Sequence, residues 1–244
     1  MTVVAIVQAR MGSSRLPGKV LADLEGEPML ARVVARCTRA TTVDRVVVAT
    51  TTAAADRAIE EWCRTASVAC TRGAEADVLD RYHQAATVAG ATVIVRITAD
   101  CPLIDPELID RVVVARSTTP EADYASNTLA PRTFPRGLDV EAFTRTALES
   151  AWLEERVPGR REHVTPAIWH RPKRYRLRRV ALERDLSAHR WTVDTSEDLE
   201  LVRALYRHFG GEDSFSWRQA LAACERHTEW SAMNRSIVQK ALPT

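Results

Sequence analysis

The sequence QARMGSSRLPGKVL at residues 8–21 places three fixed positive charges in a loop that follows an apolar run. That run, MTVVAIVQ at residues 1–8, has the length and the β-branched side chains of a buried strand. In open α/β sheets, ligands bind outside the carboxyl ends of the strands. The loop is therefore expected at a ligand-binding edge, where Arg10, Arg15 and Lys19 converge on one anion.

The remaining residues of this loop favour a phosphate ligand. Gly12 and Gly18 let backbone N–H groups approach an anion, and Ser13 and Ser14 add hydroxyl donors. Pro17 stiffens the end of the loop. The array suits a triphosphate, with a basic surface turn as the alternative for this segment taken alone.

Two familiar phosphate-binding loops do not fit the spacing. A P-loop has four residues between its glycines and a Ser or Thr after its lysine, whereas five residues separate Gly12 from Gly18 and Val20 follows Lys19. The dinucleotide fingerprint G-x-G-x-x-G does not occur. The loop therefore indicates another class of nucleotide site.

Length and charge narrow the function. A chain of 244 residues with 45% hydrophobic content predicts one domain over residues 1–244, with a helical tail from about residue 209. With 34 basic and 32 acidic side chains, no global field favours nucleic acid or a membrane surface. The densest basic cluster, residues 160–179, is expected to be a solvated face or to help hold an anionic substrate. No signal peptide or membrane-spanning run is expected, so the predicted location is cytoplasmic.

The five cysteines are odd in number, widely spaced and never paired as C-x-x-C. This pattern argues against a disulfide framework and against structural zinc. They are expected to be reduced thiols in or near the core.

Short apolar runs alternate with amphipathic runs, which is typical of a doubly wound α/β fold with a mostly parallel sheet. A helix is expected to begin at Ser196 as its N-cap. Further strands are predicted at residues 43–50, 68–71, 92–97, 123–126 and 138–143, and helices at residues 29–39, 54–65, 76–89, 106–116 and 217–240.

Two aspartates follow apolar runs and are candidates for a metal site. Asp100 comes after residues 93–99, and Asp194 comes after the shorter run at residues 191–193. Both runs are predicted to be strands that end at the edge carrying the loop, so the two carboxylates can share one Mg²⁺ with substrate phosphate oxygens. A helix N-cap is the alternative for each, particularly for Asp194.

Other polar residues have less specific patterns. Asp77 and Arg81 lie four apart and predict a surface ion pair on a helix. Asp139 and Glu141 are two residues apart and so lie on one face of an expected strand, where they are suited to bind sugar hydroxyls. His163 lies beside the basic cluster, where a structural role and a substrate contact are both open.

Taken together, seven segments resemble the cytidylyltransferases that activate acidic sugars as CMP conjugates. These are the acylneuraminate and 3-deoxy-manno-octulosonate enzymes, and the resemblance is strongest to the spore coat polysaccharide protein F (SpsF) branch. It runs from residue 3 to about residue 208, and its segments, in the family's order, are QARMGSSRLPGKVL, RGAEADVLDRYHQAA, VRITADCPLID, DYASN, GLDVEAF, REHVTPAIW and WTVDTSEDLELV.

The resemblance implies a nucleotide-diphospho-sugar transferase fold, CTP as donor and a role in nucleotide-sugar and polysaccharide biosynthesis. It implies Mg²⁺ as cofactor on Asp100 and Asp194, and partners limited to CTP and a small anionic acceptor, with a homodimer as one assembly. Lys19, Arg15, Asp100 and Asp194 are the expected catalytic residues. The expected nucleotide-binding residues are Arg10, Gly12, Ser13, Ser14, Arg15, Lys19, Arg72, Asp77 and Thr98, and the expected acceptor-binding residues are Arg136, Asp139, Glu141 and His163.

Two departures from the family pattern concern the acceptor. Ala99 stands where glycine is usual, and Arg136 stands where an acidic residue commonly precedes Gly-Leu-Asp. The added positive charge favours a phosphate, phosphonate or carboxylate on the acceptor. A glycosyltransferase of related fold and a non-catalytic nucleotide-binding protein are the alternatives, although the Asp-x-Asp motif usual in the former is absent.

Overall fold

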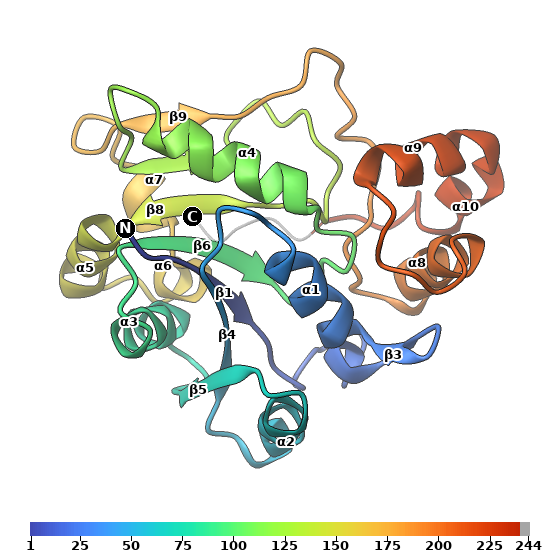
Figure 1. The fold of residues 1–244 in the computed structure, drawn as a ribbon, viewed down its shortest axis with the longest axis horizontal. Helices are drawn as coiled ribbons and strands as arrows, with labels where there is room; N and C mark the ends of the chain where they lie inside the picture. Colours follow the sequence, from blue (N-terminus) through green and yellow to red (C-terminus); the bar gives the residue numbers. More distant parts are fainter. Residues whose placement is uncertain (240–244) are drawn as a thin grey trace.

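The structure is a computed structural model that describes residues 1–239. Its centre is a sheet in the order β5-β4-β1-β6-β8-β7-β9 (Figure 1). Strands β1, β4, β5 and β6 are parallel, β8 is antiparallel to β6 and β7, and β9 is parallel to β7. The strand bounds are Val3–Gln8 (β1), Arg45–Thr51 (β4), Ala69–Gly73 (β5), Val93–Thr98 (β6), Tyr124–Ser126 (β7), Glu141–Thr144 (β8) and Leu177–Arg179 (β9).

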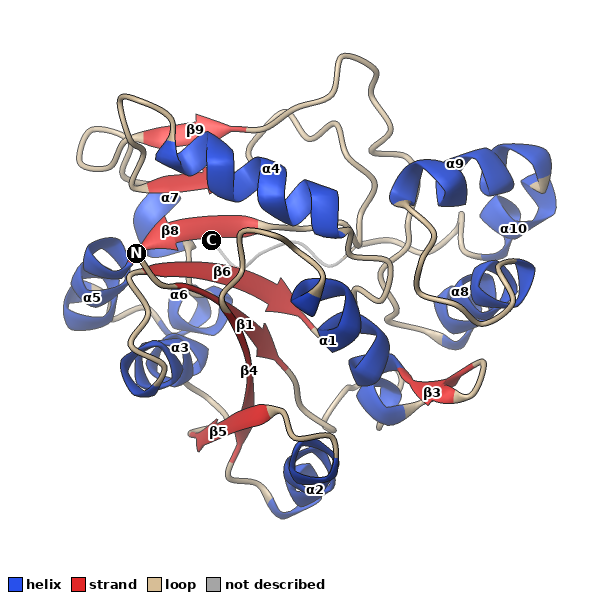
Figure 2. Ribbon diagram, in the orientation of Figure 1, coloured by secondary structure: helices blue, strands red, loops and turns tan. Residues whose placement is uncertain are grey.

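Helices cover both faces of the sheet (Figure 2). One core contains residues of α1 (Met29–Thr38), α2 (Arg57–Thr65), α4 (Pro106–Ser117), α8 (Ser196–His208) and α9 (Trp217–Arg226). The other core contains residues of α3 (Val78–Val88), α5 (Arg145–Glu154) and α7 (Pro166–Trp169). Strand β1 contributes Val3, Ala5 and Val7 to the first core and Val4 and Ile6 to the second, which explains its unbroken apolar run.

The remaining elements are short. A hairpin of β2 (Asp23–Leu24) and β3 (Glu27–Pro28) follows the 3₁₀ helix η1 (Lys19–Leu21). A second 3₁₀ helix, η2 (Ala54–Asp56), precedes α2, and α6 (Pro158–His163) precedes α7. Helices α8, α9 and α10 (Thr228–Met233) form a group at one end of the sheet (Figure 1). Within the described residues, no helix is long and apolar enough to span a bilayer.

The α/β fold with a mostly parallel sheet is confirmed, and most predicted elements are present with shifted ends. The strand predicted at residues 191–193 is wrong. These residues run across the ends of the strands instead, where Val193 N donates to Asp100 O at 2.8 Å and Trp191 N donates to Arg136 O at 2.7 Å. A pair of loop carbonyls, rather than a neighbouring strand, holds this segment.

Three further expectations are corrected. The N-cap of α8 is Thr195, not Ser196, because the Thr195 hydroxyl accepts from Asp198 N in a capping box. The strand predicted at residues 138–143 begins only at Glu141. The helix predicted at residues 217–240 divides at His227 into α9 and α10, and residue 240 lies outside the described residues. The strand β9 and the β2-β3 hairpin have no counterpart in the predicted elements.

The five cysteines are free, and four of them are buried. The expected reduced thiols are therefore what the structure contains. Cys37, Cys63 and Cys224 lie in the first core, and Cys70 packs against it.

Gly137 fixes the approach of two segments that meet at the site. Its φ is +97°, and a Cβ at this position would lie 2.4 Å from Thr192 N and 2.5 Å from Trp191 C. Both the left-handed backbone and the close approach require glycine here. The loop before β8 and the segment at residues 191–192 are thereby packed backbone to backbone.

Gly137→Ala is expected to destabilise the fold, by about 1–3 kcal/mol from backbone strain and by more from the clash. Chemical denaturation of both variants compares it with Gly90→Ala, whose φ is +63° and whose Cβ would meet nothing within 4 Å. Gly90→Ala reports the strain without the clash. An equal decrease in the free energy of unfolding in the two variants would mean that the segment at residues 191–192 shifts without cost to accommodate the added Cβ.

Candidate active site

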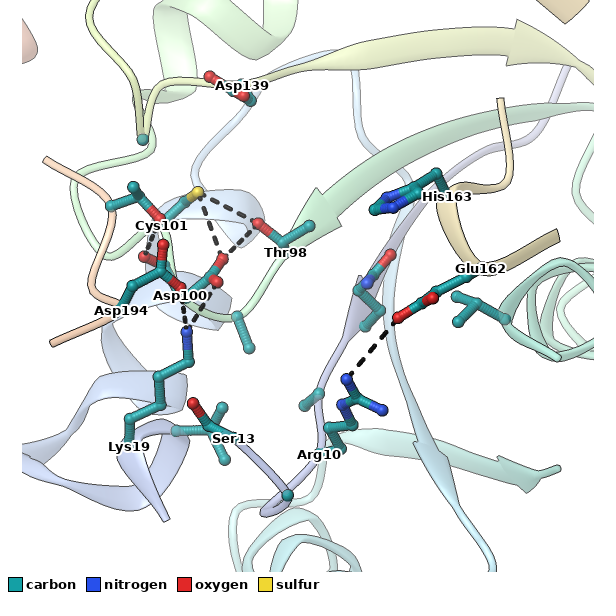
Figure 3. A pocket seen from close by; sticks show the side chains of 18 of the residues that line it. Arg10, Ser13, Lys19, Thr98, Asp100, Cys101, Asp139, Glu162, His163 and Asp194 are labelled. Carbon is teal, nitrogen blue, oxygen red and sulfur yellow. Dashed lines mark hydrogen bonds and ion pairs between the residues drawn. The ribbon is translucent and has the colours of Figure 1, made fainter. Parts of the chain in front are cut away.

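A cavity of about 610 Å³ lies at the carboxyl ends of β1 and β6 (Figure 3). The loop that follows β1 forms one side of it, and α6 and the loop before β8 form other parts of the lining. Most of the residues predicted from the sequence meet here. The predicted residues that line the cavity are Arg10, Gly12, Ser13, Ser14, Arg15, Lys19, Thr98, Asp100, Arg136, Asp139, His163 and Asp194.

Arg72 and Asp77, expected at the nucleotide, do not line the cavity. The Arg72 guanidinium donates to Thr51 O and Ala53 O and pairs with Glu60 at 2.7 Å. Asp77 is the N-cap of α3, where it accepts from Asp80 N at 2.9 Å. These side chains therefore fasten elements that surround the site.

The predicted ion pair between Asp77 and Arg81 is also absent from the described contacts. Asp77 pairs with Arg161 at 2.8 Å, and Arg81 donates to the carbonyls of Ala74 and Glu75. Arg81 is 3% exposed, because its side chain turns inward to these carbonyls. It lines the cavity, which the helical spacing alone did not indicate.

Glu141, expected at the acceptor, lies in the core beside the cavity. Its carboxylate pairs with Arg96 and accepts from the hydroxyls of Tyr124 and Thr165. Since these partners occupy both of its oxygens, its role in the structure is to hold Arg96. Arg96 does line the cavity, and its Nε has no hydrogen-bond partner among the described residues.

Lys19 lies at the centre of the site. Its Nζ lies 2.9 Å from Asp100 Oδ2, 2.9 Å from Asp194 Oδ1 and 2.6 Å from Val193 O (Figure 3). The side chain is only 9% exposed. Burial lowers the pKa of Lys19, but the two carboxylates outweigh it, and the net pKa is raised.

Asp194 is surrounded by cations. Besides Lys19, Arg15 and Arg190 each place an Nη2 atom 2.8 Å from its Oδ2. Burial raises the pKa of Asp194, but the lowering by Lys19, Arg190 and Arg15 is larger than this effect. The net pKa therefore lies below the usual 3.8. The N-cap alternative does not apply to Asp194, because Thr195 caps α8.

The two aspartates are placed to serve one divalent cation. Each has an oxygen 2.9 Å from the same Lys19 nitrogen, so these oxygens lie within twice that distance of each other. No group of three or more His, Cys, Asp or Glu side chains suited to a metal occurs among residues 1–239. Two carboxylates completed by substrate phosphates and water is a set of ligands that Mg²⁺ accepts, so the residues present fit this ion.

Asp56 anchors the loop that follows β1, although no motif marks it in the sequence. This side chain is 2% exposed. Its Oδ1 accepts from Met11 N at 2.6 Å, and its Oδ2 accepts from the Thr51 hydroxyl. The loop after β1 is thereby tied to the end of β4.

Arg136, Asp139 and His163, the cavity residues predicted to bind the acceptor, differ in their charges and partners. Among the described residues, Arg136 makes no ion pair, whereas Asp139 is held by both Nη atoms of Arg132 at 2.7 and 2.8 Å. Burial and the nearby Arg96 lower the pKa of His163, so its ring is neutral at pH 7. Of these three side chains, Arg136 is therefore the cation without a carboxylate partner.

The basic cluster at residues 160–179 is mostly engaged within the chain. Arg171 and Arg174 pair with Glu154, and Arg178 and Arg179 donate to backbone carbonyls. These contacts tie β9 and α7 to their neighbours. They give this cluster a structural role.

Comparison with known proteins gives a consistent result. A family model described as Cytidylyltransferase matches residues 4–220. The spore coat polysaccharide biosynthesis protein SpsF of Bacillus subtilis is 31% identical over 234 residues, which cover 93% of this chain and 95% of that protein. A 3-deoxy-manno-octulosonate cytidylyltransferase from an Anaeromyxobacter species is 33% identical over 240 residues, covering 83% of this chain and 96% of the relative.

A solved structure described as a cytidylyltransferase from Leptospira borgpetersenii superposes closely. Its TM-score is 0.90 at 32% sequence identity, and the match covers 98% of this chain and all of the other. The similarity therefore includes the C-terminal helices as well as the sheet.

Asp194→Asn is expected to lower the free energy of unfolding by about 2–3 kcal/mol at neutral pH, because three cations lose their shared anion. The folded pKa of Asp194 is depressed, so its contribution is present above pH 3.8 and is lost as the pH falls through the folded value. The difference in the free energy of unfolding between wild type and variant should become smaller below pH 3.8.

Urea denaturation across this pH range measures this difference. Asp185→Asn is the control, because Asp185 is exposed and, within residues 1–239, its carboxylate accepts only from the nearby Ser187. If the difference in the free energy of unfolding stays constant with pH, the lower stability of Asp194→Asn comes from packing and not from the lost charge.

Proposed function

This chain belongs to the cytidylyltransferase family and is a CTP-dependent nucleotidyltransferase, and we propose that it transfers CMP from CTP to a small acceptor carrying a carboxylate, phosphate or phosphonate. Pyrophosphate is the second product. The observation that carries the proposal is the position of Lys19 between Asp100 and Asp194, in a cavity that Arg136 also lines.

The loop after β1 binds the triphosphate. Lys19 and Arg15 now pair with carboxylates, and Arg10 lies 3.6 Å from Glu75 and 3.9 Å from Glu162 at exposed positions. Such long, exposed pairs contribute little, so Arg10 exchanges Glu75 and Glu162 for phosphate oxygens at low cost. The backbone at Gly12 and the hydroxyl of Ser13 complete the cradle.

Asp100 and Asp194 would hold the divalent cation that accompanies CTP. When bound, this cation offsets negative charge on the phosphates during transfer. The Thr98 hydroxyl donates to Asp100 Oδ1 at 2.6 Å and leaves Oδ2 toward Lys19. The carboxylate of Asp100 is therefore oriented before any ligand arrives.

The reaction is an in-line displacement. An acceptor oxygen attacks the α-phosphorus of CTP, and the bond to the bridging oxygen of pyrophosphate breaks. Arg10, Arg15 and Lys19 stabilise the charge that builds on the pyrophosphate. No cysteine or histidine nucleophile is needed, and the buried Cys101 thiol, whose pKa is raised by burial, stays protonated.

Arg136 and the neutral His163 are assigned to the acceptor. Arg136 supplies the charge that an anionic group requires, and the His163 ring supplies a hydrogen bond to a hydroxyl. The relative from Anaeromyxobacter is named for 3-deoxy-manno-octulosonate, a sugar acid, and SpsF is named for polysaccharide synthesis. Both names support a sugar acid as the first acceptor to test.

Pyrophosphate release is the direct test. With CTP and Mg²⁺, release should require an acceptor, and sugar acids, sugar phosphates and phosphonates should be assayed in turn beside uncharged sugars. Mass spectrometry should find a CMP conjugate of the active acceptor. Release supported only by uncharged sugars would contradict the proposed acceptor class, and a product in which the acceptor carries a sugar from a nucleotide sugar would favour the glycosyltransferase alternative.

Arg136→Ala is expected to raise the acceptor's KM about 10–100-fold, because a charge-assisted contact contributes about 1.5–3 kcal/mol. The KM for CTP should change by less than about threefold. Arg136→Lys keeps the charge without the planar fork and should lie between wild type and Arg136→Ala. A selective rise in the KM for CTP would move Arg136 to the nucleotide.

A further inference from the structure

Asp194 has a cationic partner that the proposed reaction does not use. Nη2 of Arg190 donates to Oδ2 of Asp194 at 2.8 Å, the oxygen that Arg15 also contacts. Lys19 and Arg15 line the 610 Å³ cavity, but Arg190 lines a neighbouring cavity of about 490 Å³ instead. Arg190 therefore reaches Asp194 from outside the substrate cavity, and any effect on the reaction passes through Asp194.

Asp198 holds Arg190 and Asp194 together. It is fully buried, and its two oxygens accept from Nε and Nη2 of Arg190 at 2.9 and 3.1 Å. Its Oδ2 also accepts from the backbone N–H groups of Asp194 and Thr195. One carboxylate thus fixes the backbone of Asp194 and the guanidinium that contacts its side chain.

The C-terminal segment at residues 234–239 closes this network. Nδ2 of Asn234, a residue only 4% exposed, donates to Arg190 O at 2.9 Å and to Asp198 Oδ1 at 2.8 Å. Nη1 of Arg190 donates to Gln239 Oε1 at 2.5 Å, and Gln239 also lines the substrate cavity. A segment without a sequence motif is therefore in contact with the residue behind Asp194.

The arrangement matters most when the nucleotide is bound. A triphosphate competes with Asp194 for Lys19 and Arg15, because both cations line the cavity that it enters. Arg190 is held by Asp198 outside that cavity and stays in place. It is then the remaining cation of the chain that orients the Asp194 carboxylate.

We propose that Arg190 is a positioning residue for Asp194, and that Asn234 and Gln239 belong to the active site because they fix Arg190 and Asp198. The proposal rests on the role that the proposed function gives to Asp194. Its consequence is measurable without an acceptor, as the factor by which Mg²⁺ strengthens the binding of CTP.

The experiment measures the dissociation constant of CTP by calorimetry, with Mg²⁺ and with EDTA. In wild type, Mg²⁺ should tighten CTP binding. We call the ratio of the dissociation constant in EDTA to that in Mg²⁺ the gain, and Asp194→Asn should remove most of it. Arg190→Gln should reduce the gain by about 10–100-fold, the usual effect of losing the partner that orients a metal ligand. Its dissociation constant in EDTA should change by less than about threefold.

A double-mutant cycle separates positioning from general support of the fold. If Arg190 acts through Asp194, adding Arg190→Gln to Asp194→Asn should change the gain by less than about twofold. A purely structural role would lower affinity equally with and without Mg²⁺, and its effect would be the same in both backgrounds. Either of these results overturns the proposal.

Asn234→Ala tests the same network where Arg190→Gln folds poorly, since it removes two hydrogen bonds and no charge. It should reduce the gain in the same direction, whereas Arg235→Ala, an exposed neighbour, should leave it unchanged. If Asp194→Asn keeps the full gain, the proposed metal site fails and the inference with it. If Asp194→Asn loses the gain and neither Arg190→Gln nor Asn234→Ala does, the inference alone fails.

Discussion

The site depends on one buried ammonium group. Each N–H of Lys19 has an acceptor within hydrogen-bond distance, on Asp100, on Asp194 and on the carbonyl of Val193. A buried charge with an incomplete set of partners is strongly destabilising, so the three segments that supply these atoms are stable only together. The loop after β1, the end of β6 and the segment at residues 192–194 thus assemble as a unit, although the first and last are far apart in the chain.

Backbone contacts bring that unit to one edge of the sheet. The parallel pairing of β1 with β6 puts Gln8 beside Thr98, so the loop and Asp100 emerge next to each other. Val193 N then donates to Asp100 O, and the segment that carries Asp194 crosses above the strand ends. This crossing explains why two aspartates that both follow apolar runs reach the same lysine when only one of them follows a strand.

The sequence was sufficient to predict the elements and site residues whose structure a local pattern determines. Apolar runs predicted β1, β4 and β6, and the position of the loop after β1 predicted where Lys19 would lie. It was insufficient where the decisive contact is distant. Glu141 has the spacing of a substrate contact, but Arg96, Tyr124 and Thr165 occupy its carboxylate. The residues at 191–193 have the composition of a strand, but the neighbouring partners are loop carbonyls, and Asn234 carries no motif because its role follows from what surrounds it.

Charge balance explains how such a site is stable without its substrate. Among the described residues, Lys19, Arg15 and Arg190 face Asp100, Asp194 and Asp198, three cations against three carboxylates in one connected network. In the proposed function, an entering triphosphate takes the two cations that line the cavity, and the divalent cation brought with it compensates the two aspartates that lose them. The buried pair of Arg190 and Asp198 takes no part in this exchange, since neither side chain lines the cavity. In the proposed function, the binding free energy of CTP is therefore a difference between two well-compensated arrangements, and the cation that arrives with the nucleotide makes it more favourable.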